Sequence, residues 1–432
     1  MPKKFWQTVV TLIAVAILAN AAGVLAQEAQ PITYNSYNGD PTPRAFDEKI
    51  VAMWNEAHPE MPVMHSIIAH EDFKQAIRAY LTADPAPDVM TWFAGNRARF
   101  FIDRGLIADI SDMWAENGFD EAYAPGFQAL ATVDDKQYFL PTSYYWWAVY
   151  YRPSLFEQAG ITEEPETWDE FLAACDTLNA AGIRPITIGT RYPWTTAGWF
   201  DYLNMRVNGP EFHIDLMLLK ESYTDDRVKE VFTYWNQLLE HNCFIDDPAA
   251  YTWQEGLGFM ARNEAAMYLI GQFIVDEISA NYADQFATED GGMDLDFFRF
   301  PIINPDVPIG EDAPTDGFFI AANARNLEGG KAFLAFLGSQ EVQQMSFEEL
   351  GRLPTRVDVD ISGANPATQK GIALIQGADY IAQFYDRDTT PEMAEAGMNA
   401  FVAFWDDPSS IDGLLEDLEA DRVRLAEEMA SQ

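Results

Sequence analysis

Aromatic side chains crowd one short segment of the sequence, residues 144–151. Six of its eight positions carry rings: Tyr144, Tyr145, Trp146, Trp147, Tyr150 and Tyr151. Side chains of an extended segment alternate in direction, so Tyr145 and Trp147 share one face while Tyr144 and Trp146 share the other. One face can be core and the other can stack on a ligand, because Trp and Tyr combine a large apolar body with a polar tip. We therefore expect a ligand between two domains here, the alternative being a central strand buried on both faces.

The sequence contains few of the patterns that mark an enzyme. The spacings G-x-S-x-G, H-E-x-x-H, C-x-x-C and that of the P-loop do not occur. Only His70-Glu71-Asp72 places a histidine in a dense polar group, and a helix-capping role is favoured there over a metal site. With 68 acidic residues, no carboxylate pair can be singled out for glycoside hydrolysis. We therefore predict a binding protein with no catalytic residue, no metal and no cofactor.

The first 26 residues have the order of a secretory signal peptide. Two lysines precede an apolar stretch at residues 5–25, and Val24-Leu25-Ala26 offers a cleavage site. An uncleaved membrane anchor is the alternative, because the stretch approaches the length of a membrane span. No cysteine lies near the cleavage point, and no later segment is apolar enough to cross a bilayer. The predicted location is the periplasm, with no membrane insertion after cleavage.

Acidic residues greatly outnumber basic ones. The chain has 68 acidic and 27 basic side chains and a formal charge of −41, and cleavage after Ala26 removes two lysines and no acid, which makes the charge −43. Such a field repels nucleic acid and anionic lipid and disfavours an anionic small molecule. Neutral and cationic ligands remain compatible with it, and the acidic excess is also typical of a saline habitat.

Chain length predicts two domains. Removal of 26 of the 432 residues leaves 406, close to half of them apolar, which is too many for one ordinary core. The only cysteines, Cys175 and Cys243, fall in helical patterns of the same predicted region. An exported protein can pair them in a disulfide, and two buried thiols are the alternative.

Strands alternating with helices position the candidate residues of the first domain. Residues 32–37, 62–68 and 87–92 read as strands, and residues 43–57 and 72–81 read as helices. This order predicts a mainly parallel sheet with helices on both faces, which binds ligands outside the carboxyl ends of its strands. The residues at those ends are Tyr37, Asn38, Asp40, Glu71, Trp92 and Asn96.

A second α/β region follows the aromatic segment. Thr167 and Glu170 have the spacing of a capping box that opens a helix. A strand at residues 183–189 leads into a turn that contains Trp194, and a buried strand at residues 265–273 leaves Gln272 and Phe273 at its end. Further helices are expected at about residues 225–241, 253–261, 327–337, 366–375, 391–404 and 411–430.

Several short motifs, each weak alone, occur in a specific order. They are the signal peptide, the strand at residues 87–92, and the segments 105–110, 138–141, 150–156, 165–170, 266–271 and 316–317. Over nearly the whole mature chain this order resembles the extracellular solute-binding proteins of bacterial ABC importers, sugar-binding type, similar to maltose-binding protein. The resemblance implies two α/β lobes, each with a mainly parallel sheet flanked by helices, joined at a hinge. Lobe I would comprise residues 27–145 plus 316–358, and lobe II residues 146–315 plus 359–432.

The same resemblance implies where a ligand is held. Trp92 and Trp194 fall at stacking positions of the first and second lobes, and Tyr145 falls at the hinge. Phe273 replaces a tryptophan of the family, which removes an indole donor. The ligand-binding residues predicted from strand ends and resemblance together are Tyr37, Asn38, Asp40, Glu71, Trp92, Asn96, Tyr145, Trp147, Trp194, Gln272, Phe273, Asp316, Gly317, Arg352, Asp386 and Arg387.

These residue types suit a neutral, hydroxylated ligand. A pyranose has an apolar face that stacks on Trp or Tyr and hydroxyls that pair with Asp, Asn, Gln and Arg. We predict the substrate-binding component of a carbohydrate ABC transporter, a monomer that captures a mono-, di- or oligosaccharide and delivers it to transmembrane permease subunits. Two alternatives stay open: a receptor for a cation such as a polyamine, for which aromatic rings and negative charge are also apt, and a secreted glycosidase.

Overall fold

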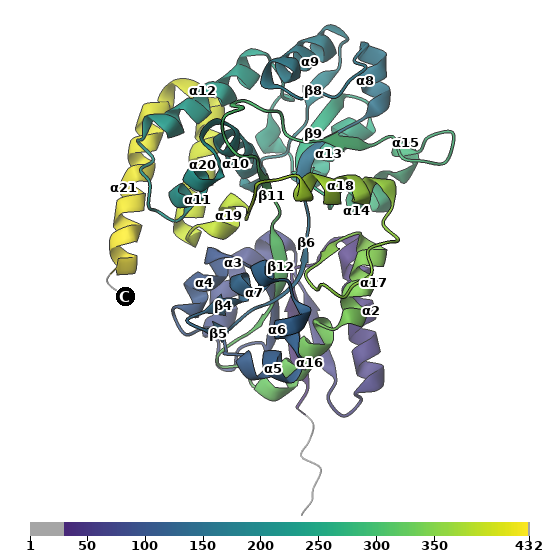
Figure 1. Cartoon of the computed structure of the whole chain (residues 1–432), viewed down its shortest axis with the longest axis vertical. Helices are drawn as coiled ribbons and strands as arrows, with labels where there is room; N and C mark the ends of the chain where they lie inside the picture. The colour runs from purple at the N-terminus through teal and green to yellow at the C-terminus, as the bar shows by residue number, and fades with distance from the viewer. Residues whose placement is uncertain (1–29, 431–432) are drawn as a thin grey trace, which may run out of the picture.

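The computed structural model describes residues 30–430, so the predicted signal peptide at residues 1–26 lies outside the described residues. Two separate sheets, each flanked by helices, form two α/β lobes stacked along the long axis of the molecule (Figure 1). Between residues 30 and 430 no helix is both long enough and apolar enough to span a membrane. The two-lobe α/β architecture predicted from the sequence is confirmed.

Lobe I is built on a six-stranded sheet in the order β13-β6-β12-β3-β1-β2. Its strands are β1 (Ile32–Ser36), β2 (Val63–Ile67), β3 (Val89–Phe93), β6 (Leu140–Tyr144), β12 (Thr315–Ile320) and β13 (Leu353–Pro354). The main covering helices are α2 (Pro41–Ala57), α3 (His70–Thr82), α4 (Asn96–Ile102), α16 (Leu327–Leu337) and α17 (Gln340–Leu350). Trp54 of α2 contacts Phe333 of α16 on one face, while Trp92 of β3 contacts Phe73 of α3 and Phe101 of α4 on the other.

Lobe II is built on a four-stranded sheet in the order β10-β7-β9-β8. Its strands are β7 (Trp147–Tyr151), β8 (Arg184–Ile186), β9 (Ala265–Gly271) and β10 (Asp296–Phe298). Every residue of β7 and β9 is buried, because helices and loops cover both faces. Helices α12 (Asp226–Glu240) and α20 (Pro391–Asp406) pack on α10 (Trp194–Asn208), and the C-terminal α21 (Ile411–Ala430) packs on α20 and α12. These helices flank this lobe in Figure 1.

The ladders are more mixed than the sequence predicted. In lobe I, β1 is parallel to β2 and β3, whereas β12 is antiparallel to both β3 and β6. In the four-stranded sheet of lobe II, β8 is parallel to β9, whereas β7 is antiparallel to both β9 and β10. The lobe I sheet is mixed because β12 arrives from the other lobe and pairs first with the carboxyl ends of β3 and β6. It therefore has to run in the opposite direction to these two strands.

Three connections carry the chain between the sheets. Residues 145–146 join β6 to β7, residues 313–314 lead into β12, and residues 355–365 connect β13 to α18 (Pro366–Gln376). A small parallel pair, β11 (Gly310–Asp312) with β14 (Tyr380–Ala382), lies beside the second connection. Cys175 and Cys243 are both buried with free thiols, so the alternative of two buried thiols describes this structure.

The predicted capping box is present at the start of α9 (Trp168–Ala180). Thr167 accepts a hydrogen bond from the Glu170 amide, and the Glu170 carboxylate accepts one from the Thr167 amide at 3.0 Å. Replacing Thr167 with Ala should lower the free energy of unfolding by about 1 kcal/mol, because one amide of the first turn loses its acceptor. Urea denaturation measures this quantity.

Thr177→Ala is the matched control, since it makes the same chemical change at an exposed position inside the same helix. It should alter the free energy of unfolding by less than about 0.5 kcal/mol. Equal losses in the two variants would show that the cap does not stabilise the helix.

Candidate functional site

A cleft of about 310 Å³ lies between the lobes and takes residues from both. Clefts of this size that combine apolar walls with a few polar groups are typical sites for small molecules. Most of the predicted ligand-binding residues line it: Tyr37, Asn38, Asp40, Glu71, Tyr145, Trp147, Trp194, Phe273, Asp316, Arg352, Asp386 and Arg387. The aromatic segment divides as its alternation predicts, because Tyr145 and Trp147 line the cleft while Trp146 packs against Phe297.

The predicted position of Trp92 at the cleft is wrong. Its side chain is fully buried in the core of lobe I, where it packs against Phe73 and Phe101. Alternation along β3 turns the next residue, Phe93, toward the polar network of the site, and the Arg387 guanidinium lies 4.3 Å from the centre of this ring. The strand was therefore predicted correctly, but the side chain that faces the site is Phe93 and not Trp92.

Three other predicted residues lie near the site without lining the cleft. Gln272 is buried and its Nε2 donates to the carbonyl of Leu350 at 3.3 Å. Gly317 sits where β12 approaches β6, and a Cβ there would lie 2.0 Å from the carbonyl oxygen of Leu140. Asn96 donates hydrogen bonds to Asp388. All three residues therefore support the structure around the cleft.

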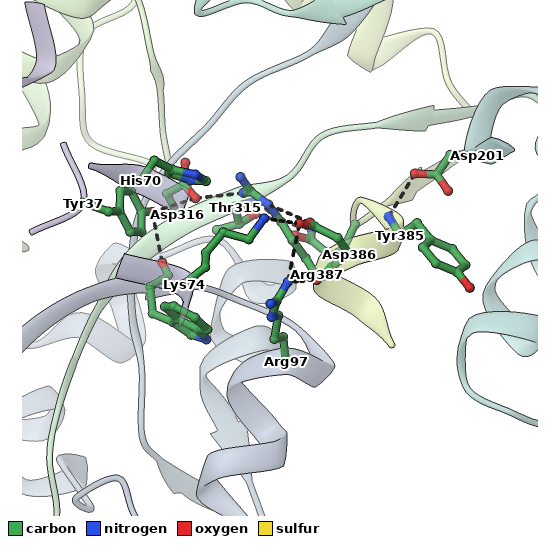
Figure 2. Close-up of polar contacts among 12 residues, drawn as sticks. Tyr37, His70, Lys74, Arg97, Asp201, Thr315, Asp316, Tyr385, Asp386 and Arg387 are labelled. Carbon is green, nitrogen blue, oxygen red and sulfur yellow. Dashed lines mark hydrogen bonds and ion pairs between the residues drawn. The ribbon is translucent and has the colours of Figure 1, made fainter. Parts of the chain in front are cut away.

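Arg387 lies at the centre of a polar network that joins the lobes (Figure 2). It belongs to the short helix α19 (Tyr385–Asp388), and its Nη1 donates to Asp316 Oδ1 of β12 at 2.8 Å. Its Nη2 donates to the hydroxyl of Tyr145 at 2.8 Å, and the Tyr37 hydroxyl donates to the same Asp316 oxygen at 3.0 Å. A charge from one lobe is thus satisfied by a carboxylate of the other.

Burial and pairing fix the protonation of this network. Burial alone would lower the pKa of Arg387, but Asp316, Tyr145 and Asp386 raise it above its ordinary value. Burial raises the pKa values of Tyr37 and Tyr145, with Asp316 adding to the effect in each case. Around neutral pH the guanidinium is therefore charged and both phenols keep their protons.

Asp386 carries a second set of pairs to lobe I. Lys74 Nζ lies 2.8 Å from Asp386 Oδ2 and 3.4 Å from Glu71 Oε2, and Arg97 Nη1 donates to the Asp386 carbonyl at 2.7 Å. Burial opposes ionisation of both acids. Even so, Lys74 and Arg97 lower the pKa of Asp386 far below its ordinary value, and Lys74 with His70 lowers that of Glu71 to about 2.

Helix α19 is anchored at both ends. Toward lobe I, the amide and side chain of Asn96 donate to Asp388 Oδ1 at 3.1 and 2.9 Å. Gly95, at φ 90°, allows this approach, since a Cβ there would lie 2.9 Å from the same oxygen. Toward lobe II, the Tyr385 amide donates to Asp201 Oδ2 at 2.9 Å, as Figure 2 shows. These contacts fix Arg387 at the cleft.

The lobe II side of the cleft is aromatic. Trp147 stacks on Phe384 with 4.5 Å between ring centres and meets Trp194 edge to face at 6.0 Å. Trp253 lies edge to face with Phe273 at 5.2 Å. The Trp147 indole N–H is buried and, among the described residues, has no hydrogen-bond partner.

Sequence reasoning missed part of the lining, notably Lys74, Trp253, Gln254, Asp276 and Glu277. Trp253 and Gln254 begin helix α13 (Trp253–Ala261) directly after a capping threonine, and Asp276 and Glu277 lie in α14 (Ile274–Glu277) just after β9. The helix start after β9 was therefore a usable signal for Asp276 and Glu277, and the capping threonine was one for Trp253 and Gln254. Lys74 lies one turn inside α3, and only its pairing identifies it.

Two lobes around a cleft with aromatic walls and fixed polar groups define a receptor for small solutes. A family model described as bacterial extracellular solute-binding protein matches residues 38–344, and the chain belongs to this family.

Relatives and solved structures are consistent with this membership. The chain is 23% identical over 337 residues to an uncharacterized ABC transporter extracellular-binding protein of Pyrococcus horikoshii (77% of this chain, 73% of that protein). It is 24% identical over 311 residues to a probable sugar-binding periplasmic protein of Mesorhizobium japonicum (70% of each). Among solved structures, the bacterial solute receptor AcbH superposes with a TM-score of 0.83 at 29% identity, covering 91% of this chain and 99% of that one. A chitin oligosaccharide binding protein shares the fold with a TM-score of 0.83 at 22% identity, covering 92% and 99%.

The Lys74 pairs predict a dependence of stability on pH. An acid whose pKa is lowered on folding stabilises the native state above its unfolded pKa, about 4.3 for Glu, and loses this contribution as the pH falls through the folded value, about 2 for Glu71. Lys74→Gln should therefore reduce the loss of stability between about pH 5 and pH 2. Urea midpoints measured across this range give the slope.

Lys229→Gln is the control, because it removes a lysine from an exposed pair with Asp412. Its slope should match that of the unaltered protein, since exposed ion pairs contribute little. Identical slopes for Lys74→Gln and the unaltered protein would refute the stabilising role of the buried pairs.

Proposed function

We propose that this chain is the substrate-binding component of a bacterial carbohydrate ABC transporter, which captures a sugar between its lobes and delivers it to transmembrane permease subunits. The observation that carries the proposal is the pairing of aromatic walls with fixed donors and acceptors in one interlobe cleft. Relatives support it: one is named a probable sugar-binding periplasmic protein, and AcbH is described as preferring β-D-galactopyranose exclusively.

The cleft offers what a sugar ring needs. Trp194, Phe273 and Tyr145 supply flat apolar surface for the faces of a pyranose. Asp316 accepts and Arg387 donates at positions held by protein contacts, so hydroxyls meet groups that are already oriented. A neutral sugar leaves the charges of this network paired with each other.

We infer that the lobes close around the ligand, because contacts span the cleft. Gln254 of lobe II reaches Asp40 of lobe I at 3.4 Å. A ligand favours the closed state only if it makes more contacts there than in the open state, and residues of both lobes line this cleft. We take residues 27–145 plus 316–358 and residues 146–315 plus 359–432 as the units that move, with the connections between the sheets as hinges.

The proposal includes four finer points. The protein binds its sugar without chemical change, acts as a monomer, reaches the periplasm through a signal peptide at residues 1–26, and engages the permease subunits of its transporter. The family and the solved neighbours are receptors, which supports the first and last of these.

A panel of mono-, di- and oligosaccharides tests the function by thermal shift and calorimetry. A bound sugar at about 100 times its dissociation constant adds roughly 2.7 kcal/mol of stability. Trp194→Ala should weaken sugar binding at least about tenfold, because it removes an aromatic wall of the cleft. Trp92→Ala, the matched control, should cost about 3–5 kcal/mol of folding stability with little change in affinity, because this ring is core.

Two other results would overturn the function. One is binding of polyamines with no binding of any sugar. The other is turnover of a chromogenic glycoside above background, which would make the protein a glycosidase.

A further inference from the structure

The charged residues of the cleft form two groups that differ in balance. In the first, around Arg387 and Lys74, each carboxylate has a cationic nitrogen within 3.4 Å. The second consists of three acids, Asp40, Asp276 and Glu277, together with Arg352, and the exposed Asp72 and Arg44 line the cleft as well. None of the three acids forms an ion pair with any residue between 30 and 430. One part of the cleft is thus neutralised by the protein, and the other is left with excess negative charge.

Asp276 is the least satisfied of the three. Asp40 accepts a hydrogen bond from Gln254, and Glu277 accepts one from Asn281 at 2.8 Å, whereas the Asp276 carboxylate has no partner in the described part of the chain. Burial raises the pKa of Asp276 to about 6, an effect that Arg352 opposes and Asp40 increases. Arg352 also makes no ion pair within residues 30–430, so it does not neutralise this carboxylate by direct contact.

Two aromatic rings that line the same cleft as Asp276 are of a type that binds cations. Phe273 precedes Asp276 by three residues, and both it and Trp253 line the cleft. An ammonium group is attracted by ring faces and by a carboxylate, and the two attractions are stronger where water is largely excluded. A neutral hydroxyl would satisfy one oxygen of Asp276 and leave its charge uncompensated.

The other groups of the cleft require a ligand with hydroxyl oxygens. Arg387 and Asp316 line the cleft and are held in fixed orientations, so they can donate to and accept from polar groups of a ligand. A simple polyamine has no acceptor for an N–H donor once it is protonated. A ligand that satisfies both parts of the cleft therefore combines a hydroxylated ring with a positive charge.

We propose that the solute is an amino sugar, with its protonated amine bound by Asp276 against the rings of Phe273 and Trp253 and its hydroxyls bound by the network around Arg387. This inference rests on the proposed carbohydrate function and narrows its substrate class. Asp276 is the residue that determines the preference for the charged sugar over its neutral parent.

Calorimetric titration near neutral pH tests the preference with matched sugars. The probes are D-galactosamine and D-glucosamine, their parents D-galactose and D-glucose, and the two N-acetyl derivatives, in which the charged amine is replaced by an uncharged amide. At least one amino sugar should bind about tenfold or more tightly than both its parent and its N-acetyl form.

Variants of Asp276 assign the preference to this side chain. Asp276→Asn should bring the ratio of amino-sugar to parent affinity to within about twofold, and Asp276→Glu, which keeps the charge, should retain a preference for the amino sugar. Asp417→Asn, on an exposed position of α21, removes one charge elsewhere and should leave the ratio unchanged. A melting temperature for Asp276→Asn no lower than that of the unaltered protein shows that the variant is folded.

The outcomes separate this inference from the proposed function. If parents or larger neutral oligosaccharides bind and the amino sugars bind no tighter, the inference is overturned and the sugar receptor stands. The inference also fails if Asp276→Asn keeps the full preference. If polyamines bind and no sugar does, both fail.

Discussion

Burial of the Arg387 guanidinium between two lobes is the constraint on which the site depends. An unpaired charge at this depth would be costly, so the chain has to bring Asp316 from lobe I and Tyr145 from the crossing to the same place. Asp386, the preceding residue, requires Lys74 and Arg97 in turn. The charged side chains of helix α19 are therefore all paired only when the helix lies in this one position. As a result, the polar groups that face the cleft are held in place before any ligand binds.

The proposed substrate preference depends on the difference between this paired network and the rest of the cleft. Donors and acceptors around Arg387 are held by protein partners, which reduces the entropy lost when a sugar binds. Asp276 also lines the cleft but has no ion pair among the described residues, and its carboxylate is the group that we propose a charged ligand satisfies. In our proposal, the network around Arg387 orients the solute and Asp276 selects it.

Local patterns predicted the fold well because they depend on neighbours in sequence. The capping box at Thr167 and the buried run of β9 follow from spacing alone, and the predicted strand ends indicated Tyr37 and Asn38, both of which line the cleft. Such local patterns could not predict contacts between segments that are distant in the sequence. Which face of β3 points to the cleft, and which cation pairs with Asp386, depend on the approach of α19 across more than 290 residues of chain.

A crystal structure with the tightest-binding sugar of the panel tests the central claim most directly. The ring should lie in the interlobe cleft against Trp194, with hydroxyls within hydrogen-bond distance of Asp316 or Arg387. The pair between these two residues should remain near the 2.8 Å of the present structure. A sugar bound outside the cleft, or an Arg387 side chain displaced from Asp316 by the ligand, would contradict a site organised by this buried pair.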